Sequence, residues 1–97
     1  ADFIGARYNL AITYGIVQEW EWAIHHLSIV YQANPNNCEI VYLLGYATLR
    51  LNDLEDAEYY FEEYLRKCPD GFRAEAVQQI LHDMEEHAGQ QDFYEGM

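Results

Sequence analysis

A 34-residue interval organises this 97-residue chain more strongly than any single motif does. Pro35 and Pro69 are separated by this interval, and so are Ala23 and Ala57. The same spacing relates Leu10 to Leu44, Ala11 to Gly45, Trp20 to Leu54, and Leu27 to Phe61. Because self-similarity at a period of about 20 to 50 residues is typical of stacked repeats, the sequence predicts two copies of one structural unit.

Each copy has the residue pattern of two successive helices. Its first helix carries residues three and four positions apart, which share one helical face. These are Arg7, Leu10, Ala11 and Tyr14 in the first copy, and Val41, Leu44, Gly45 and Thr48 in the second. The second helix carries a small residue, Ala23 or Ala57, where a neighbouring helix can approach closely.

The predicted turns between helices carry helix-capping residues. Asn36, with Glu39 three positions later, is typical of a helix N-terminus, because the asparagine side chain accepts a backbone N–H. Asn52 and Asp53 mark the start of the next helix in the same way. We therefore expect short turns and well-defined helix ends.

A 34-residue unit with two helical stretches and a closing proline resembles the tetratricopeptide repeat. The family opens with a large residue, then Leu-Gly, then tyrosine; here Arg7 stands for the usual tryptophan and Thr48 for the usual tyrosine. The resemblance implies an all-α solenoid of two antiparallel helix pairs, with repeats at residues 4–37 and 38–71.

A further helix is predicted over residues 72–88. Its apolar stripe consists of Val77, Ile80, Leu81 and Met84. The opposite side is polar, so this helix fits the solvated cap that stacked repeats need at their end. Residues 1–88 are thus predicted to form one domain, and residues 89–97 a flexible tail.

Two repeats and a cap make a short array, since about three repeats are usually needed for stability. We therefore expect either further repeats upstream or association of the domain with itself. Apolar residues near the N-terminal edge are candidate contacts in a homo-oligomer, namely Phe3, Ile4, Trp20 and Trp22.

The charge of the chain excludes several classes of partner. With 17 acidic and 5 basic residues, the formal net charge is -12. Nucleic acid and anionic membrane surfaces both require a basic footprint, so neither is an expected partner. No apolar run is long enough to span a membrane, so no membrane insertion is expected. The acidic segment 53–65 is interpreted as a solvated helix face with Leu54 directed inward, or alternatively as a docking site for a basic partner.

The sequence offers no convincing catalytic or metal site. It lacks a phosphate-binding glycine loop, a GxSxG elbow and an HExxH motif. His82 with Glu86, and Asp83 with His87, have a spacing that ligates metals, but each pair lacks the third and fourth ligands of a zinc site. We expect no enzyme activity, no cofactor and no metal.

Cys38 and Cys68 are the only cysteines. They lie almost one repeat apart along the stack, which predicts a separation too large for a disulfide. Two reduced thiols would suit a cytoplasmic protein.

The resemblance implies that the first helix of each pair lines a concave surface. The residues that would form this partner-binding groove are Tyr8, Ile12, Ile16, Tyr42, Tyr46, Leu49 and Arg50. Such a surface suits an apolar peptide, because tyrosine gives a large contact area at low entropic cost. Some family members grip a carboxylate here, but Tyr8, Ile12 and Tyr46 stand where polar groups would be needed. Alternatively, the groove is covered by a third helix pair, the capping helix, a dimer mate or the chain's own tail, with Phe93 and Tyr94.

These observations favour a non-catalytic protein–protein interaction module, a scaffold or adaptor that binds a protein or peptide segment in a tyrosine-rich groove. Two alternatives have the same fold. One is a self-assembly module that forms homo-oligomers, and the other is a secretion-type chaperone.

Overall fold

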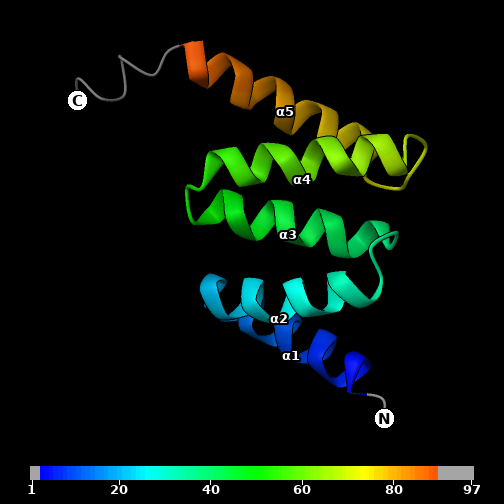
Figure 1. Cartoon of the computed structure of the whole chain (residues 1–97). Coiled ribbons are helices and arrows are strands. Elements are labelled where there is room, and N and C mark those ends of the chain that lie inside the picture. The colour runs from blue at the N-terminus through cyan, green and yellow to red at the C-terminus, as the bar shows by residue number, and fades with distance from the viewer. Residues whose placement is uncertain (1–2, 90–97) are drawn as a thin grey trace.

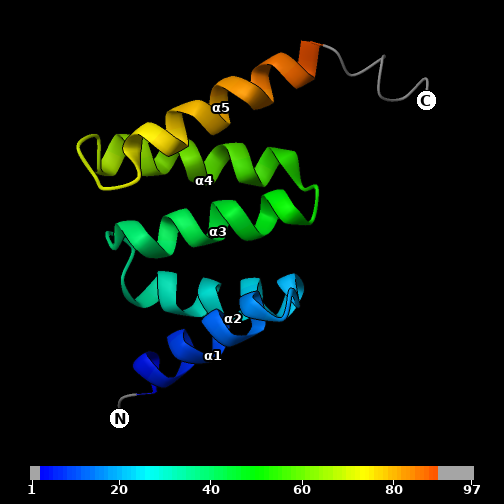
Figure 2. The same cartoon turned by 180° about the vertical axis from the view of Figure 1, so that it is seen from behind.

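The computed structural model describes residues 3–89, with side chains described as far as Glu86, and all regular structure in this part of the chain is helical. The helices are α1 (Ile4–Ile16), α2 (Trp20–Ala33), α3 (Cys38–Arg50), α4 (Leu54–Lys67) and α5 (Ala74–Gly89). They stack in chain order, and each packs mainly against its sequence neighbours (Figures 1 and 2). The all-α prediction is confirmed. The expected tail lies outside the described residues, apart from Gly89.

No helix in residues 3–89 combines the length and the apolar character needed to cross a membrane.

The turns that follow α1 and α3 have the same geometry. Gln18 and Asn52, 34 residues apart, both adopt the left-handed conformation, with φ of 63° and 62°. The next residue then bonds back to the helix: Glu19 N–H donates to the Tyr14 carbonyl at 2.8 Å, and Asp53 N–H to the Thr48 carbonyl at 2.9 Å. This is the Schellman ending, which satisfies the last helical carbonyls.

The helix caps differ in part from the prediction. Asn37, not Asn36, caps α3, and its side chain accepts the N–H groups of Glu39 and Ile40. Asp53 caps α4 as expected and accepts the N–H of Asp56. The residues at the corresponding positions of α1 and α2 make no side-chain cap.

The core consists of two clusters, one among α1, α2 and α3 and the other among α3, α4 and α5. The first contains Ala11, Leu27, Val30, Ile40 and Leu44, and the second contains Val41, Ala57, Phe61, Tyr64, Ala74 and Val77. Gly45 allows the closest helix contact, because a Cβ there would lie only 2.7 Å from Cε1 of Phe61. The apolar side of α5 closes the second cluster, with Ile80, Leu81 and Met84 half-buried against it.

Leu54 is exposed, contrary to the inward direction expected from the helical pattern. It is the first residue of α4, directly after the turn, and 47% of its surface is exposed. Leu10 is also partly exposed, because it faces the open end of the stack below α1.

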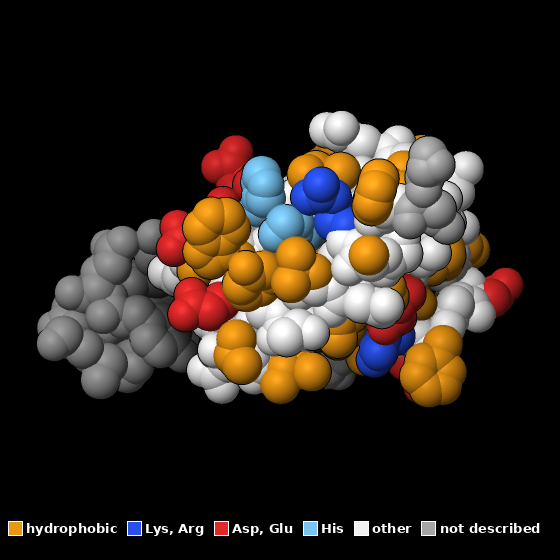
Figure 3. Space-filling view, turned by 90° about the horizontal axis from the view of Figure 1, so that it is seen from below, with side chains coloured by type: hydrophobic (Ala, Val, Ile, Leu, Met, Phe, Trp, Pro, Cys, Tyr) orange, Lys and Arg blue, Asp and Glu red, His pale blue; other side chains and the backbone are white. Residues whose placement is uncertain are grey.

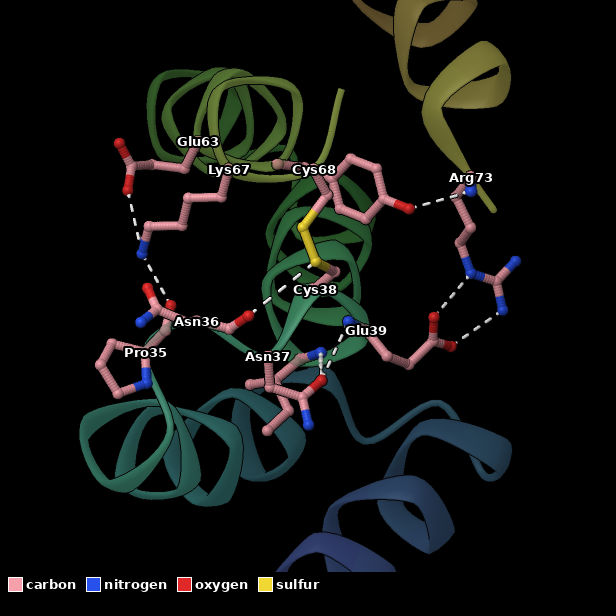
Figure 4. Close-up of a disulfide and its surroundings, with 11 residues drawn as sticks. Pro35, Asn36, Asn37, Cys38, Glu39, Glu63, Lys67, Cys68 and Arg73 are labelled. Atoms are coloured by element: carbon pink, nitrogen blue, oxygen red, sulfur yellow. Dashed lines mark hydrogen bonds and ion pairs between the residues drawn. A yellow bond between two sulfur atoms is a disulfide. The ribbon is translucent and has the colours of Figure 1, made fainter. Parts of the chain in front are cut away.

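The two cysteines form a disulfide, so the expectation of reduced, separated thiols was wrong. Their Cα atoms are 6.4 Å apart. Cys38 begins α3 and Cys68 directly follows α4, so the antiparallel arrangement of these helices brings the two residues together (Figure 4). The expected separation was one repeat along the stack. In an antiparallel pair, however, the start of the first helix lies beside the end of the second.

Polar contacts surround this disulfide (Figure 4). The Arg73 guanidinium donates to both carboxylate oxygens of Glu39, each at 2.9 Å. Lys67 Nζ donates to the Pro35 carbonyl at 2.7 Å and pairs with Glu63 at 3.4 Å. The loops before α3 and after α4 are therefore fastened to one another at this edge of the stack.

Candidate functional site

A crevice of about 370 Å³ opens between the first and second helix pairs. Its lining comes from α1, α2, α3 and the first turn: Ala11, Ile12, Gly15, Ile16, Gln18, Trp20, Ala23, Leu27, Leu43, Tyr46, Ala47 and Arg50. Ala11, Ala23 and Ala47 are buried and form the floor. The crevice exists because these side chains are small, so that α1 and α3 leave space above α2.

The walls of the crevice are apolar and aromatic. Trp20 meets Tyr46 edge to face, with ring centroids 5.5 Å apart. The guanidinium of Arg50 lies over the Trp20 ring, 5.4 Å from its centroid. Arg50 is the one charged residue in the lining, so the crevice offers an apolar interior with a single positive group at its rim.

The structure brings together four of the seven groove residues predicted from the sequence. Ile12, Ile16, Tyr46 and Arg50 line the crevice. The other three, Tyr8, Tyr42 and Leu49, lie outside it.

Tyr42 is covered by its own chain. Its ring packs on those of Phe61 and Tyr64, with centroids 6.1 and 6.3 Å away. The Arg73 guanidinium lies over the same ring, 4.3 Å from the centroid. Leu49 packs against the second core cluster. Tyr42 and Leu49 therefore serve mainly to join α3 to its neighbours.

Tyr8 lies on α1 and packs against the first core cluster. Burial raises the pKa of its hydroxyl, and the nearby Glu39 carboxylate raises it further. Tyr8 belongs to the half-buried surface that adjoins Glu39.

The predicted oligomer contacts are dispersed. Trp20 belongs to the crevice wall, which the sequence reasoning missed. Phe3 and Trp22 are exposed, whereas Ile4 packs partly into the first cluster. The signal that could have indicated the crevice was one small residue on each of three successive helices, Ala11, Ala23 and Ala47.

Histidine and basic side chains lie among hydrophobic ones at the open end formed by α1 and α2 (Figure 3). Arg7 Nη1 donates to Nδ1 of His26 at 2.9 Å, and the His26 ring stacks on Tyr14 with centroids 5.6 Å apart. Burial lowers the pKa of His26, and the charges of Arg7 and His25 lower it further. The imidazole is therefore held neutral as a hydrogen-bond acceptor.

The described part of the chain contains no cluster of three or more His, Cys, Asp or Glu residues suited to a metal ion. His82 and Glu86 form an exposed pair on α5, with 3.3 Å between Nε2 and Oε1. The side chain of His87 lies outside the described residues.

Compared with protein-family models, curated proteins and solved structures, the chain matches none.

Proposed function

We propose that this chain is a non-catalytic protein–protein interaction module that binds an apolar side chain of a peptide segment in the crevice between its two helix pairs. The crevice carries the proposal: it is preformed, apolar and open, and its volume falls in the range of ligand pockets. Burying one leucine- or phenylalanine-sized side chain contributes about 1.5–3 kcal/mol, enough to anchor a peptide that makes other contacts around the rim.

The repetition of one turn geometry along the chain supports this proposal. The Schellman turns at Gln18 and Asn52 recur at the same 34-residue interval as the sequence pattern. A stack of such units presents successive helices to a partner. We therefore propose two repeats and a capping helix as the architecture.

The crevice chemistry favours binding over catalysis. Tyr46 and Arg50 are the only lining residues with ionisable side chains. A hydrolytic or transfer reaction needs a nucleophile, a base and a stabilising group within mutual reach. The lining supplies no such set.

The disulfide changes the expected compartment. A cytoplasmic location was inferred from reduced thiols, and the Cys38–Cys68 bond removes that reason. Disulfides persist mainly in oxidising compartments, so we propose that the protein works in one. Alkylation of free thiols in the source cells, followed by mass spectrometry, tests this: modification of both cysteines would contradict it.

The proposal is tested by filling the crevice. Gly15 lines it, and a Cβ there meets only Trp20, at an ordinary 3.7 Å. Gly15→Leu places a large side chain in the space while keeping α1 intact. Gly5→Leu is the matched control on the same helix, since a Cβ at Gly5 meets nothing within 4 Å.

The measurement is binding to random linear peptides displayed on phage, with selected peptides then titrated by calorimetry. We expect Gly15→Leu to weaken selected peptides at least about tenfold, the equivalent of 1.4 kcal/mol, and Gly5→Leu to leave them unchanged. Equal affinity of the wild type and Gly15→Leu would show that peptides bind elsewhere and would contradict the proposal.

A further inference from the structure

Phe72 is the most exposed large apolar side chain in the described structure, with 96% of its surface accessible. It lies on the turn between α4 and α5, after Asp70 and Gly71. An aromatic side chain of this size normally contributes 150 to 250 Å² of burial when it finds a partner. Here the folded chain leaves it projecting into solvent.

The turn that carries Phe72 is held firmly. Cys68 on its near side is bonded to Cys38, and Arg73 on its far side is fixed to Glu39. The Tyr64 hydroxyl also accepts the backbone N–H of Arg73 at 2.9 Å. A rigid turn loses little conformational entropy when it binds, so Phe72 is preorganised as a projecting knob.

We propose that Phe72 of one copy inserts into the crevice of a second copy of this chain. The inference rests on the proposed function, because it identifies the crevice ligand as the turn of residues 69–73 from another molecule. The crevice, at about 370 Å³, is lined mainly by apolar groups and has room for a phenyl ring.

Charge complementarity supports this occupant. Asp70 is an exposed carboxylate two residues from Phe72, and Arg50 is the positive group at the crevice rim. The other described basic side chains already have polar partners, namely Arg7 with His26, Arg66 and Lys67 with Glu63, and Arg73 with Glu39. Arg50 lies over the Trp20 ring and has neither a hydrogen bond nor an ion pair among the described residues, so it can receive Asp70 from another copy.

The positions of knob and crevice determine the kind of assembly. The turn of Phe72 lies at one edge of the stack, whereas the turns after α1 and α3, beside the crevice, lie at the opposite edge (Figures 1 and 2). This separation favours a head-to-tail contact, in which a copy gives its knob to one neighbour and its crevice to another. Such contacts form rings or open chains, unlike a symmetric dimer.

The contact is small, so the association should be weak. We expect sedimentation velocity of the oxidised wild-type protein to show a mass that rises between about 10 µM and 1 mM, in the range of transient interfaces. Phe72→Ser should remain monomeric throughout. Tyr59→Ser, which removes another exposed aromatic side chain from α4, is the matched control and should associate like the wild type.

A mixing experiment tests whether the knob of one copy enters the crevice of another. Phe72→Ser keeps the crevice but lacks the knob, and Gly15→Leu keeps the knob but has a filled crevice. Each should be monomeric alone, and an equal mixture should give a dimer and nothing larger, because only one productive contact can form. A monomeric mixture, or self-association of Phe72→Ser alone, would overturn the proposal.

Charge reversal tests the orientation of the turn. Arg50→Glu and Asp70→Arg should each weaken self-association at least about fivefold, and the double variant should recover most of the loss. If the double variant associates no better than the single variants, the pairing of Arg50 with Asp70 is overturned. Failure of this proposal can be told apart from failure of the proposed function. If the wild type stays monomeric at about 1 mM but Gly15→Leu loses affinity for the displayed peptides, the crevice binds peptides and only its occupation by a second copy is contradicted.

Discussion

The two helix pairs have matching sequence patterns but very different surroundings. Leu44 of α3 is fully buried, whereas Leu10, its counterpart 34 residues earlier in α1, is 42% exposed. The second pair lies between α2 and α5, carries the disulfide and has side-chain caps on both helices. The first pair is open on one side and has neither feature. Equivalent positions therefore gain stability from their neighbours in the stack as much as from their own residues.

This difference should appear as a gradient of local stability. Helices with fewer buried contacts open at lower free energy than the core of a protein does. We expect amide hydrogens of α3 and α4 to exchange most slowly and those of α1 to exchange fastest among the first four helices. Uniform protection across both pairs would mean that the chain opens only as a whole.

The largest expected effect comes from the disulfide of the second pair. Cys38→Ser together with Cys68→Ser should lower the free energy of unfolding by about 3–4 kcal/mol, because a loop of this length loses its constraint in the unfolded chain. Urea unfolding followed by circular dichroism measures the change.

Adding a thiol reductant gives the control for that experiment. It should destabilise the wild type to nearly the level of the double variant and leave the double variant unchanged. A wild type insensitive to reductant would show that the bond contributes little to stability.

The sequence was sufficient to predict the five helices and the apolar side of α5, because helical spacing and capping residues are local signals. It could not predict that Cys38 and Cys68 meet, since that depends on how two helices pair. Tyr42 shows the same limit: its exposed helical position suggested a ligand surface, but Arg73 folds back over its ring. The crevice likewise depends on the spacing of α1 and α3, which no single helix encodes.

The next effect concerns helix packing at Gly45. Gly45→Ala should destabilise the protein by about 1–3 kcal/mol, because the added methyl group meets the Phe61 ring. The first pair has Ala11 and Leu27 at the corresponding positions. Combining Gly45→Ala with Phe61→Leu recreates that arrangement and should recover part of the loss.

Thermal and urea unfolding of the single and the double variant measure the loss of stability and its recovery. Gly5→Ala, in the exposed first turn of α1, is the control and should stabilise by less than about 0.5 kcal/mol, because the helix propensity of alanine counts only in part at a helix end. If Gly45→Ala were stabilising too, close approach of α3 and α4 at this point would be disproved.

A smaller effect is expected at the two turns. Gln18 adopts a left-handed conformation that glycine accepts without strain, so Gln18→Gly should stabilise by about 0.5–1 kcal/mol. Asn52→Gly should gain less, because asparagine tolerates this conformation better than glutamine does. Equal gains in unfolding free energy at both sites would show that the residue already present makes no difference.

The smallest effect is a pH dependence confined to the first pair. The folded protein holds the pKa of His26 below its usual value of 6.5, so the unfolded chain binds the proton more readily. Stability should therefore fall as the pH drops below about 6.5, with the loss complete below the folded pKa. The effect is small because the site is partly open to water, which screens the charge of Arg7.

His26→Gln isolates this contribution, because glutamine can still accept the Arg7 hydrogen bond but does not titrate. Urea midpoints of the wild type and the variant, measured from about pH 7.5 to about pH 5.5, should converge or cross as the wild type loses stability. The acidic residues affect both proteins equally, so the difference between the two curves reports on His26 alone. Parallel curves would show that the Arg7–His26 contact is too weak to favour the neutral imidazole. The first helix pair would then be held less firmly than the second by its polar contacts as well as by its packing.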